Sequence, residues 1–178
     1  MKREVVLGVS GSIAIYKSLD LINLLKEKGL NISVIMTKEA EELIKPLTFQ
    51  TLSHNPVYTE MFSPPQENNP LHIRLAERGD LILICPATAN IIGKIAHGIC
   101  DDLLTCTVIS TKAPVLICPA MNENMYKNKI IEENIRKLKN FGYKFIEPVK
   151  GKLACGKTGI GHLAPLTQIV AEVFALLK

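Results

Sequence analysis

Several residue types that build particular kinds of protein are scarce in this chain of 178 residues. Tryptophan is absent and aromatic residues make up 5% of the sequence, so the core must be built from aliphatic side chains. The cysteines are odd in number and contain no C-x-x-C pair, which argues against a disulfide framework and against a cysteine-rich zinc site. Such usage is typical of the reducing cytoplasm, where we expect the protein to be located. The cysteines are Cys85, Cys100, Cys106, Cys118 and Cys155.

Long apolar segments are also absent. The first apolar run, residues 5–9, has a glycine inside it, whereas a secretory signal needs about 7–15 apolar residues. No segment approaches the roughly 18 consecutive apolar residues of a membrane span. We therefore expect no membrane partner.

Positive charge is concentrated in one part of the sequence. The formal net charge is +4, and residues 124–157 contain nine basic and three acidic residues. This part could attract an anionic substrate, or it could be the solvated face of a helix that carries Arg136, Lys137 and Lys139. Nucleic acid is not an expected partner, because the basic residues lack the interleaved aromatic pattern of a base-stacking platform.

Short apolar runs alternate with segments of helical spacing along the chain. The runs predict strands at 5–9, 32–36, 81–85, 115–118 and 143–146. The helical spacing predicts helices at 13–28, 39–44, 47–52, 71–78, 89–97, 102–110, 127–141 and 166–177. Residues 53–70 contain several Asn and Pro residues and predict a loop, and a glycine-rich segment precedes the last helix.

This alternation predicts a single-domain α/β protein with a Rossmann- or flavodoxin-like fold of three layers and a mostly parallel sheet. The continuous apolar runs at 81–85 and 115–118 suit strands that are buried on both faces. In such sheets ligands bind beyond the carboxyl ends of the strands. The residues that follow each strand are therefore the candidate site residues.

The first two of these loops carry residues suited to a phosphate. Gly11 allows a close approach of the backbone, and Ser12 can cap a helix whose first N–H groups can bind an anion. The second strand is followed by Thr37, whereas NAD-binding domains usually place an acidic residue there for the ribose. This difference favours a mononucleotide such as FMN over NAD.

Two further loops begin at Pro86 and Pro119. The small and amide side chains of the first leave space and hydrogen-bonding groups for a flat ring: Ala87, Thr88, Ala89 and Asn90. In the second, the amide of Asn122 can bind a carboxylate, while Met121 and Met125 can pack on an apolar ligand face. Each loop taken singly is equally consistent with a helix start capped by Asn or Thr.

Together these segments resemble the flavin-dependent cysteine decarboxylase family, in order and over essentially the whole chain. Residues 11–17 are similar to its phosphate-binding turn, and His72 stands where its active-site histidine begins a helix. Residues 86–90 resemble its P-A-S-A-N-T motif, and residues 119–126 resemble its P-x-M-N-x-x-M-W motif. Residues 151–156 resemble the flap that bears the cysteine of the coenzyme A branch.

The resemblance implies an activity, namely FMN-dependent oxidative decarboxylation of 4′-phospho-N-pantothenoylcysteine. A following reduction gives 4′-phosphopantetheine and CO₂ in coenzyme A biosynthesis. It also implies that His72 is the base of the oxidation, that Asn122 binds the substrate carboxylate and that Cys155 donates the final proton. Ala154 and Gly156 are the other substrate contacts that it implies, and it implies no metal.

The resemblance places FMN against residues from four loops, and a few positions depart from the family pattern. The expected cofactor contacts are Gly11, Ser12, Thr37, Ala87, Thr88, Ala89, Asn90 and Met121. Thr88, Ile91 and Tyr126 replace Ser, Thr and Trp of the family. His162 stands where the flap usually has an arginine, so His162 or Lys157 could take over a contact to the substrate phosphate.

The cysteines differ in their sequence surroundings. Cys155 lies in the glycine-rich segment, where a reactive thiol would be accessible. The other four end apolar strands or flank a helical stretch and are predicted to be inert, buried thiols: Cys85, Cys118, Cys100 and Cys106. His54 and His97 form no metal-ligand spacing and are predicted to be structural or exposed.

By resemblance we expect residues 1–178 to form one flavoprotein domain with a substrate flap at about 148–165. We also expect a homo-oligomer, either a trimer or a dodecamer of trimers, with FMN near the subunit contact. A separate or fused phosphopantothenate-cysteine ligase is the expected protein partner.

Three alternatives share the fold. Cys155 argues against a peptidyl-cysteine decarboxylase, and the motif around Asn122 argues against a flavin prenyltransferase. A non-catalytic FMN-binding regulatory subunit stays open.

Overall fold

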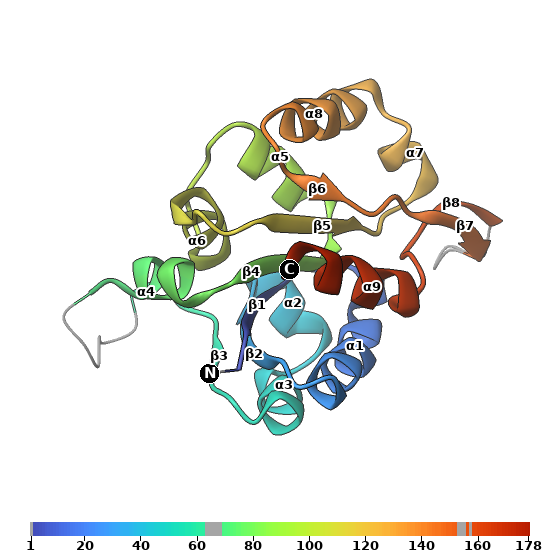
Figure 1. The fold of residues 1–178 in the computed structure, drawn as a ribbon. Coiled ribbons are helices and arrows are strands. Elements are labelled where there is room, and N and C mark those ends of the chain that lie inside the picture. The colour runs from blue at the N-terminus through green and yellow to red at the C-terminus, as the bar shows by residue number, and fades with distance from the viewer. Residues whose placement is uncertain (1, 63–68, 153–155, 157) are drawn as a thin grey trace.

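The computed structural model describes residues 2–62, 69–152, 156 and 158–178. Its centre is a six-stranded, fully parallel sheet with the strand order β3-β2-β1-β4-β5-β6 (Figure 1). The strands are β1 Glu4–Val9, β2 Asn31–Met36, β3 Val57–Tyr58, β4 Leu81–Ala87, β5 Val115–Pro119 and β6 Lys144–Phe145. The predicted α/β class and parallel sheet are confirmed.

Helices cover both faces of this sheet and complete the three layers (Figure 1). One face packs against a short 3₁₀ helix and four α-helices, which are η1 Ile13–Ile15, α1 Tyr16–Glu27, α2 Lys38–Leu43, α3 Pro46–Ser53 and α9 Leu166–Leu176. The other face packs against α4 Leu71–Arg78, α5 Ala89–Ala96, α6 Leu103–Ser110 and α8 Lys129–Asn140. A single turn, α7 Glu123–Tyr126, precedes α8.

Alternate side chains of each central strand supply these two cores. In β1, Val5 and Leu7 pack on the α1 side, whereas Val6 packs on the opposite side with α6 and α8. Because successive side chains point to opposite faces of a sheet, a strand covered on both sides must be apolar at every position. All residues of β4 are buried, as the continuous apolar run predicts.

An antiparallel hairpin stands apart from the main sheet. It pairs β7 Val149–Lys152 with β8 Thr158–His162, and it lies beside α7 at one end of the molecule (Figure 1). Helix α4 lies at the opposite end (Figure 1). The carboxyl ends of the central strands point toward the hairpin, so the two ends of the sheet have different surroundings.

The sequence prediction is wrong in three local places. The two-residue strand β3 lies in the segment predicted as a loop. So short a strand has no periodic pattern of its own, and the neighbouring Pro and Asn residues indicate a loop. The predicted helix 127–141 begins later, at Lys129, and Asn128 caps its first turn. The glycine-rich segment contains the two hairpin strands, for which the sequence analysis predicts no regular element.

Among the described residues, no helix is long and apolar enough to cross a membrane.

Candidate functional site

A pocket of about 530 Å³ lies at the carboxyl ends of β1, β4 and β5, where the fold rule places ligands. Its size is in the usual range for a small-molecule site. The described lining residues are Gly11, Ser12, Ile13, Ala14, Tyr16, Lys17, Thr88, Ala89, Ala120, Met121, Asn122, Met125, Lys152, Gly161, His162 and Leu163. Three of them are basic and none is acidic, so this wall favours an anionic ligand.

Ser10 links the loops after β1 and β4, which form the floor of the pocket, by hydrogen bonds. Its buried hydroxyl donates to the Pro86 carbonyl oxygen at 2.7 Å and accepts from the Thr88 N–H at 3.0 Å. The Ser10 N–H also donates to the Pro86 carbonyl oxygen. The loops after β1 and β4 are therefore held in a fixed relation by one small side chain.

Ser12 makes the corresponding connection to the loop after β5. Its hydroxyl donates to the Ala120 carbonyl oxygen at 3.0 Å and accepts from the Ala14 N–H, which caps η1. The Ala120 N–H in turn donates to the Ala87 carbonyl oxygen. Three loops that are far apart in the sequence thus share one hydrogen-bonded platform.

Gly11 is required by the close approach of α2. A Cβ atom at this position would lie 2.5 Å from the Cβ atom of Glu39 and 3.1 Å from its carbonyl carbon. A shift of the α2 backbone would cost considerable free energy. A larger residue at position 11 would therefore displace the loop that forms the pocket wall.

The hairpin is attached to the loop after β5 by backbone and side-chain contacts. The Met121 N–H donates to the Gly161 carbonyl oxygen at 3.1 Å. Gly161 has a φ of +138°, and a Cβ atom there would lie 2.1 Å from the Met121 carbonyl oxygen, so only glycine fits. The Ile160 N–H donates to Glu123 Oε1 at 3.3 Å, which adds a second link from β8 to α7.

Glu123 is held in its charged form by its surroundings. The hydrogen bond from the Lys127 ammonium, at 2.8 Å, and the Ile160 N–H together lower the pKa of the Glu123 carboxyl below its ordinary value. A Cβ atom at Gly159 would lie 2.4 Å from Glu123 Oε2, so the carboxylate packs directly on the hairpin backbone. Glu123 is thus a link between the hairpin and the pocket floor.

Of the residues expected to contact FMN or the substrate carboxylate, six line the pocket and three do not. Those that line it are Gly11, Ser12, Thr88, Ala89, Met121 and Asn122. Thr37 instead caps α2 by accepting from the Ala40 N–H, Ala87 is buried in β4, and Asn90 lies exposed on α5. Their roles toward a ligand stay predictions.

The side chain of Asn122 caps a helix, and the residue also lines the pocket. Its Oδ1 accepts from the Asn124 N–H at 2.9 Å, which caps α7 and fixes the orientation of the amide. The amide nitrogen is the end that can donate to a carboxylate. Both sequence interpretations of this loop, a helix cap and a site residue, are compatible with this geometry.

His72 lies far from the pocket within one chain. It is the second residue of α4, it is half-buried, and it does not contact the pocket described above. Helix α4 and the hairpin lie at opposite ends of the molecule (Figure 1). Its predicted role as a base at this pocket therefore cannot be served from the same chain in this arrangement.

Two of the predicted flap residues, Ala154 and Cys155, lie outside the described residues, as does Lys157. Gly156 is described, is exposed, and has a φ of +83°, a conformation that favours glycine. The flap expected at about 148–165 includes both strands of the hairpin.

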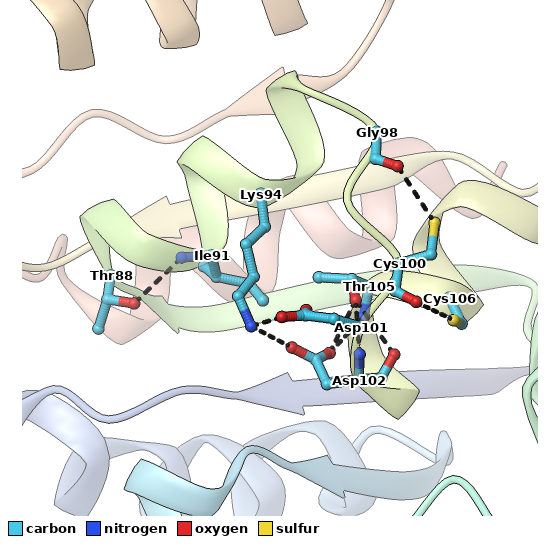
Figure 2. Close-up of polar contacts among 9 residues, drawn as sticks. All are labelled: Thr88, Ile91, Lys94, Gly98, Cys100, Asp101, Asp102, Thr105 and Cys106. Carbon is cyan, nitrogen blue, oxygen red and sulfur yellow. Dashed lines mark hydrogen bonds and ion pairs between the residues drawn. The ribbon is translucent and has the colours of Figure 1, made fainter.

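The prediction for the remaining cysteines is half right. Cys85 and Cys118 are buried on adjacent strands, and burial raises the pKa of the Cys118 thiol well above its ordinary value. Cys100, however, is exposed, and Cys106 is partly exposed on α6. Cys100 lies in the loop that precedes α6 and Cys106 lies on α6. Their sulfur atoms contact the Gly98 and Cys100 carbonyl oxygens, respectively (Figure 2).

A lysine beside this turn shows how charges are compensated away from the pocket. The Lys94 ammonium lies 2.8 Å from Asp101 and 2.9 Å from Asp102, and Asp102 also caps α6 through Thr105 (Figure 2). Burial opposes the charge on Lys94, but the two carboxylates outweigh it and raise the pKa of the ammonium. This cluster joins α5 to α6 and has a structural role.

Several pocket residues escape the sequence prediction. Lys17 is noted there only as part of a motif, and Tyr16 and Lys152 are not selected as site residues, whereas Met125 and His162 are among the ligand contacts considered there. Lys17 lies one turn after a predicted phosphate loop, which is a usable indication. Lys152 and His162 become neighbours of that loop only through the hairpin. Among the described residues no group of three His, Cys, Asp or Glu side chains is arranged to hold a metal.

Comparison with known proteins places this geometry in a family. A family model described as Flavoprotein matches residues 1–178. The chain is 48% identical over 168 residues to the coenzyme A biosynthesis bifunctional protein CoaBC of Bacillus subtilis, covering 94% of this chain and 41% of that protein. It is 42% identical over 175 residues to a probable phosphopantothenoylcysteine decarboxylase of Streptococcus mutans, covering 97% and 98% of the two chains. The chain thus spans about two fifths of the length of the bifunctional relatives that it matches.

Solved structures agree with these relatives. A variant of PPC decarboxylase in complex with pantothenoylaminoethenethiol has a TM-score of 0.89 and 31% identity, with 98% of both chains covered. The FMN-dependent cysteine decarboxylase SpaF has a TM-score of 0.86 and 27% identity, with 99% of this chain and 98% of that chain covered. The resemblance inferred from the motifs is confirmed, and the chain belongs to the Flavoprotein family.

Proposed function

We propose that this protein is an FMN-dependent decarboxylase that converts 4′-phospho-N-pantothenoylcysteine to 4′-phosphopantetheine and CO₂ in coenzyme A biosynthesis. The observation that carries the proposal is the pocket itself. Loops at 11–17, 86–90 and 119–126, each of which resembles a motif of the family, converge on it together with the hairpin. The names of the relatives in Bacillus subtilis and Streptococcus mutans support the same reaction.

The residues present fit FMN. Ile13, Ala89 and Met121 offer apolar surface for a flat ring, and Lys17 offers a cation for a phosphate at the same pocket. The narrow space at Gly11 shows that this loop is built around close backbone packing. When bound, FMN supplies the oxidation of the substrate thiol carbon and the later return of electrons, which no amino-acid side chain can provide.

Asn122 binds the substrate carboxylate through a neutral amide. A cation at this position would stabilise the negative charge of the bound substrate, and that charge leaves the carboxyl group when CO₂ departs. A neutral donor orients the carboxylate with less stabilisation of the ground state, which favours the reaction. The cap to the Asn124 N–H keeps the amide in place during the reaction.

His72 acts from a second copy of the chain. A histidine titrates near neutral pH and suits the removal of a proton from the substrate. Its distance from the pocket of its own chain supports a site completed between subunits. The apolar pocket residues Ile13, Tyr16 and Met125 are 59%, 54% and 47% exposed in the single chain, which also favours cover by a neighbour. In a homotrimer, alone or within a dodecamer, a neighbouring subunit can cover these residues and bring its His72 to the pocket.

Cys155 supplies the proton in the final reduction, with Ala154 and Gly156 beside the substrate. Strands β7 and β8 support this assignment, because they flank the segment that contains Cys155 and themselves contribute Lys152 and His162 to the pocket wall.

The whole of residues 1–178 forms one FMN-binding decarboxylase domain with its flap at about 148–165. The match of the family model over this range supports the assignment. Bifunctional relatives support a phosphopantothenate-cysteine ligase as a fused or separate partner. The absence of any paired-cysteine motif in the sequence supports action in the reducing cytoplasm.

The proposal is tested by incubating the purified FMN-bound protein with 4′-phospho-N-pantothenoylcysteine. Release of CO₂ with formation of 4′-phosphopantetheine is the expected result. A peptide with a carboxyl-terminal cysteine is the matched control substrate and should not react. Turnover of the peptide alone would make the protein a peptidyl-cysteine decarboxylase, and no turnover of either with FMN bound would leave the regulatory subunit.

A further inference from the structure

Cys100 and Cys106 lie together at the surface, at the point where the chain enters α6. The Cys106 thiol donates to the Cys100 carbonyl oxygen at 3.2 Å, and the Cys100 thiol donates to the Gly98 carbonyl oxygen at 3.6 Å (Figure 2). Cys100 is exposed and Cys106 is partly exposed. Neither is among the described residues that line the pocket, and the proposed reaction uses neither thiol.

The start of α6 fixes this arrangement. Asp102 is the N-cap, and its carboxylate accepts from the Thr105 N–H at 2.8 Å, while the Asp102 N–H donates to the Thr105 hydroxyl at 3.3 Å. This reciprocal pair is a capping box, which sets the direction in which the chain enters the helix. Cys100, two residues before the cap, thereby comes to lie beside Cys106, whose N–H donates to the Asp102 carbonyl oxygen.

The turn between the two cysteines is held from its other side by ion pairs. Asp101 and Asp102 both contact the Lys94 ammonium of α5, at 2.8 Å and 2.9 Å. In Figure 2 this ammonium lies on one side of the turn, and both sulfur atoms lie on the other. Contacts that do not involve sulfur thus hold the intervening backbone, and rotation of side chains is enough to bring the two thiols to bonding distance.

Their surroundings give the two thiols different roles. Burial raises the pKa of the Cys106 thiol, and the neighbouring Cys100 thiol and Asp102 carboxylate raise it further. Cys106 therefore stays protonated at neutral pH and reacts slowly with a small oxidant. Cys100 is the exposed member of the pair and is open to a reagent in solvent. The contact between the thiols places Cys106 to react with a group that Cys100 has taken up.

We propose that Cys100 and Cys106 form a reversible intrachain disulfide, which makes them a redox modification site on this protein. The oxidant is a low-molecular-weight disulfide such as oxidised glutathione. The Cys100 thiolate attacks one sulfur of this oxidant, which breaks its S–S bond, forms a mixed disulfide and releases the first small thiol. Cys106 then loses its proton and attacks Cys100 Sγ, which forms the bond between the two cysteines and releases the second small thiol. Two electrons and two protons pass from the protein to the oxidant, and an excess of the reduced small thiol reverses the reaction.

The test equilibrates the FMN-bound protein with mixtures of reduced and oxidised glutathione. The reaction is quenched with acid, the protein is unfolded, and its free thiols are alkylated before digestion and mass spectrometry. Trypsin cleaves after Lys94 and Lys112, so the peptide 95–112 contains Cys100 and Cys106 and no other cysteine. The expected product is this peptide with two hydrogen atoms fewer and no alkyl group.

A second cysteine pair and two variants are the controls. The thiols of Cys85 and Cys118 contact each other inside the core and should stay reduced, because the oxidant has no access to them. In Cys106→Ser, the exposed thiol should retain one glutathione, because no second thiol displaces it. In Cys100→Ser, the remaining thiol is partly covered and should react more slowly than the wild-type pair.

The folded protein should favour the disulfide over the unfolded chain. The two cysteines are six positions apart, and the fold keeps them in contact, whereas the unfolded chain must first close this loop. The equilibrium constant against glutathione should therefore be roughly tenfold higher, or more, in the native protein than in concentrated urea. By linkage, oxidation should lower the equilibrium constant of unfolding by the same factor, and a reductant should reverse the change.

Free thiols in the peptide 95–112, at glutathione ratios that oxidise the same peptide in the unfolded chain, would overturn the site. Glutathione retained on either cysteine of the wild-type protein would do the same, because the two thiols would then react separately. An equilibrium constant no higher in the native protein than in urea would show that the fold does not build the pair. None of these measurements requires turnover, so the site is tested independently of the proposed reaction.

Discussion

The two ends of the central sheet differ in whether their charged groups have partners of opposite charge. At the amino ends of the strands, the buried carboxylate of Glu4 accepts hydrogen bonds from Ser33 at 2.5 Å, from Asn31, and from Arg78 at 3.4 Å. At the carboxyl ends, Lys17 and the other basic pocket residues have no acid beside them among the described lining residues. The first network is internally compensated, as a structural network should be.

This difference separates stability from function within one fold. Compensated charges at the amino end hold strands and α4 together and need no ligand. Uncompensated positive charge at the carboxyl end gains its partner only when an anion binds. Variants at the amino end should therefore change the free energy of unfolding, and variants at the carboxyl end should change binding and catalysis.

The largest effect is expected for His72→Asn, which tests whether one amino-end residue serves the pocket of another subunit. Removal of a general base should lower turnover roughly 10²- to 10⁴-fold, while bound flavin is retained. Steady-state CO₂ release and the visible spectrum measure the two quantities. Substantial residual turnover would reject His72 as the base.

A mixing experiment sharpens this prediction. Subunits with His72→Asn and subunits with Asn122→Ala should each be inactive alone, whereas some pockets of a reassembled mixture should contain both native residues. Recovered turnover in the mixture is the expected result. If the mixed oligomer forms and stays inactive, His72 and Asn122 do not meet across a subunit contact.

Glu4→Ala breaks the compensated network at the amino end. The hydroxyl of Ser33 and the amide of Asn31 lose a charged acceptor inside the protein, which should lower the free energy of unfolding by about 2–4 kcal/mol. Arg78 is half exposed and returns to water at little cost. Urea denaturation measures the change, and Glu4→Gln should lose less because it keeps an acceptor oxygen.

FMN affinity of the folded Glu4→Ala protein should be close to that of the wild type. A loss of FMN affinity as large as the loss of stability would contradict the separation of the two ends.

Ser10→Ala breaks the platform at the carboxyl end. The partly buried Thr88 N–H loses its acceptor and the Pro86 carbonyl loses its hydroxyl donor, which should cost about 1–3 kcal/mol of stability. Here FMN affinity should fall as well, because the loops of the pocket floor lose their fixed relation. Ser110→Ala, at an exposed position on α6, is the control and should change neither quantity.

The smallest effect concerns the pH dependence of the hairpin contact. Because its pKa is lowered in the folded protein, Glu123 contributes to hairpin attachment above the ordinary glutamate pKa, and the contribution is lost as the pH falls through the lowered value. Hydrogen exchange of the Ile160 amide should therefore be more protected at neutral pH than in acid. Glu123→Gln should remove most of this difference, and an unchanged profile would contradict the role of Glu123.

Much of the fold could be predicted because β4 and β5 are continuous apolar runs and the helices show helical spacing. The run at 115–118 matches β5 within one residue, and the helical spacing at 71–78 matches α4. Strand β3 and the hairpin could not be predicted in this way. β3 has two residues, and the strands of the hairpin contain the glycines Gly151, Gly159 and Gly161, which weaken any periodic pattern.

Part of the site could also be predicted, from the position of its residues after the strands. Gly11 and Asn122 follow strands directly, so the fold rule alone brings them to the pocket. Ser10 and His162 depend on contacts between segments 76 and 145 residues apart, and nothing local in the sequence indicates such contacts. The distance of His72 from the pocket follows from the position of α4 in the fold, and a sequence motif does not indicate that position either.

The loops that converge on the pocket make the carboxyl end of the sheet a flavin site. The visible absorption spectrum of the purified protein, recorded before and after addition of FMN and removal of the excess, tests it most directly. We expect the two-band spectrum of an oxidised flavin, with FMN released on denaturation. A protein that is colourless as isolated and retains no FMN after incubation would contradict it.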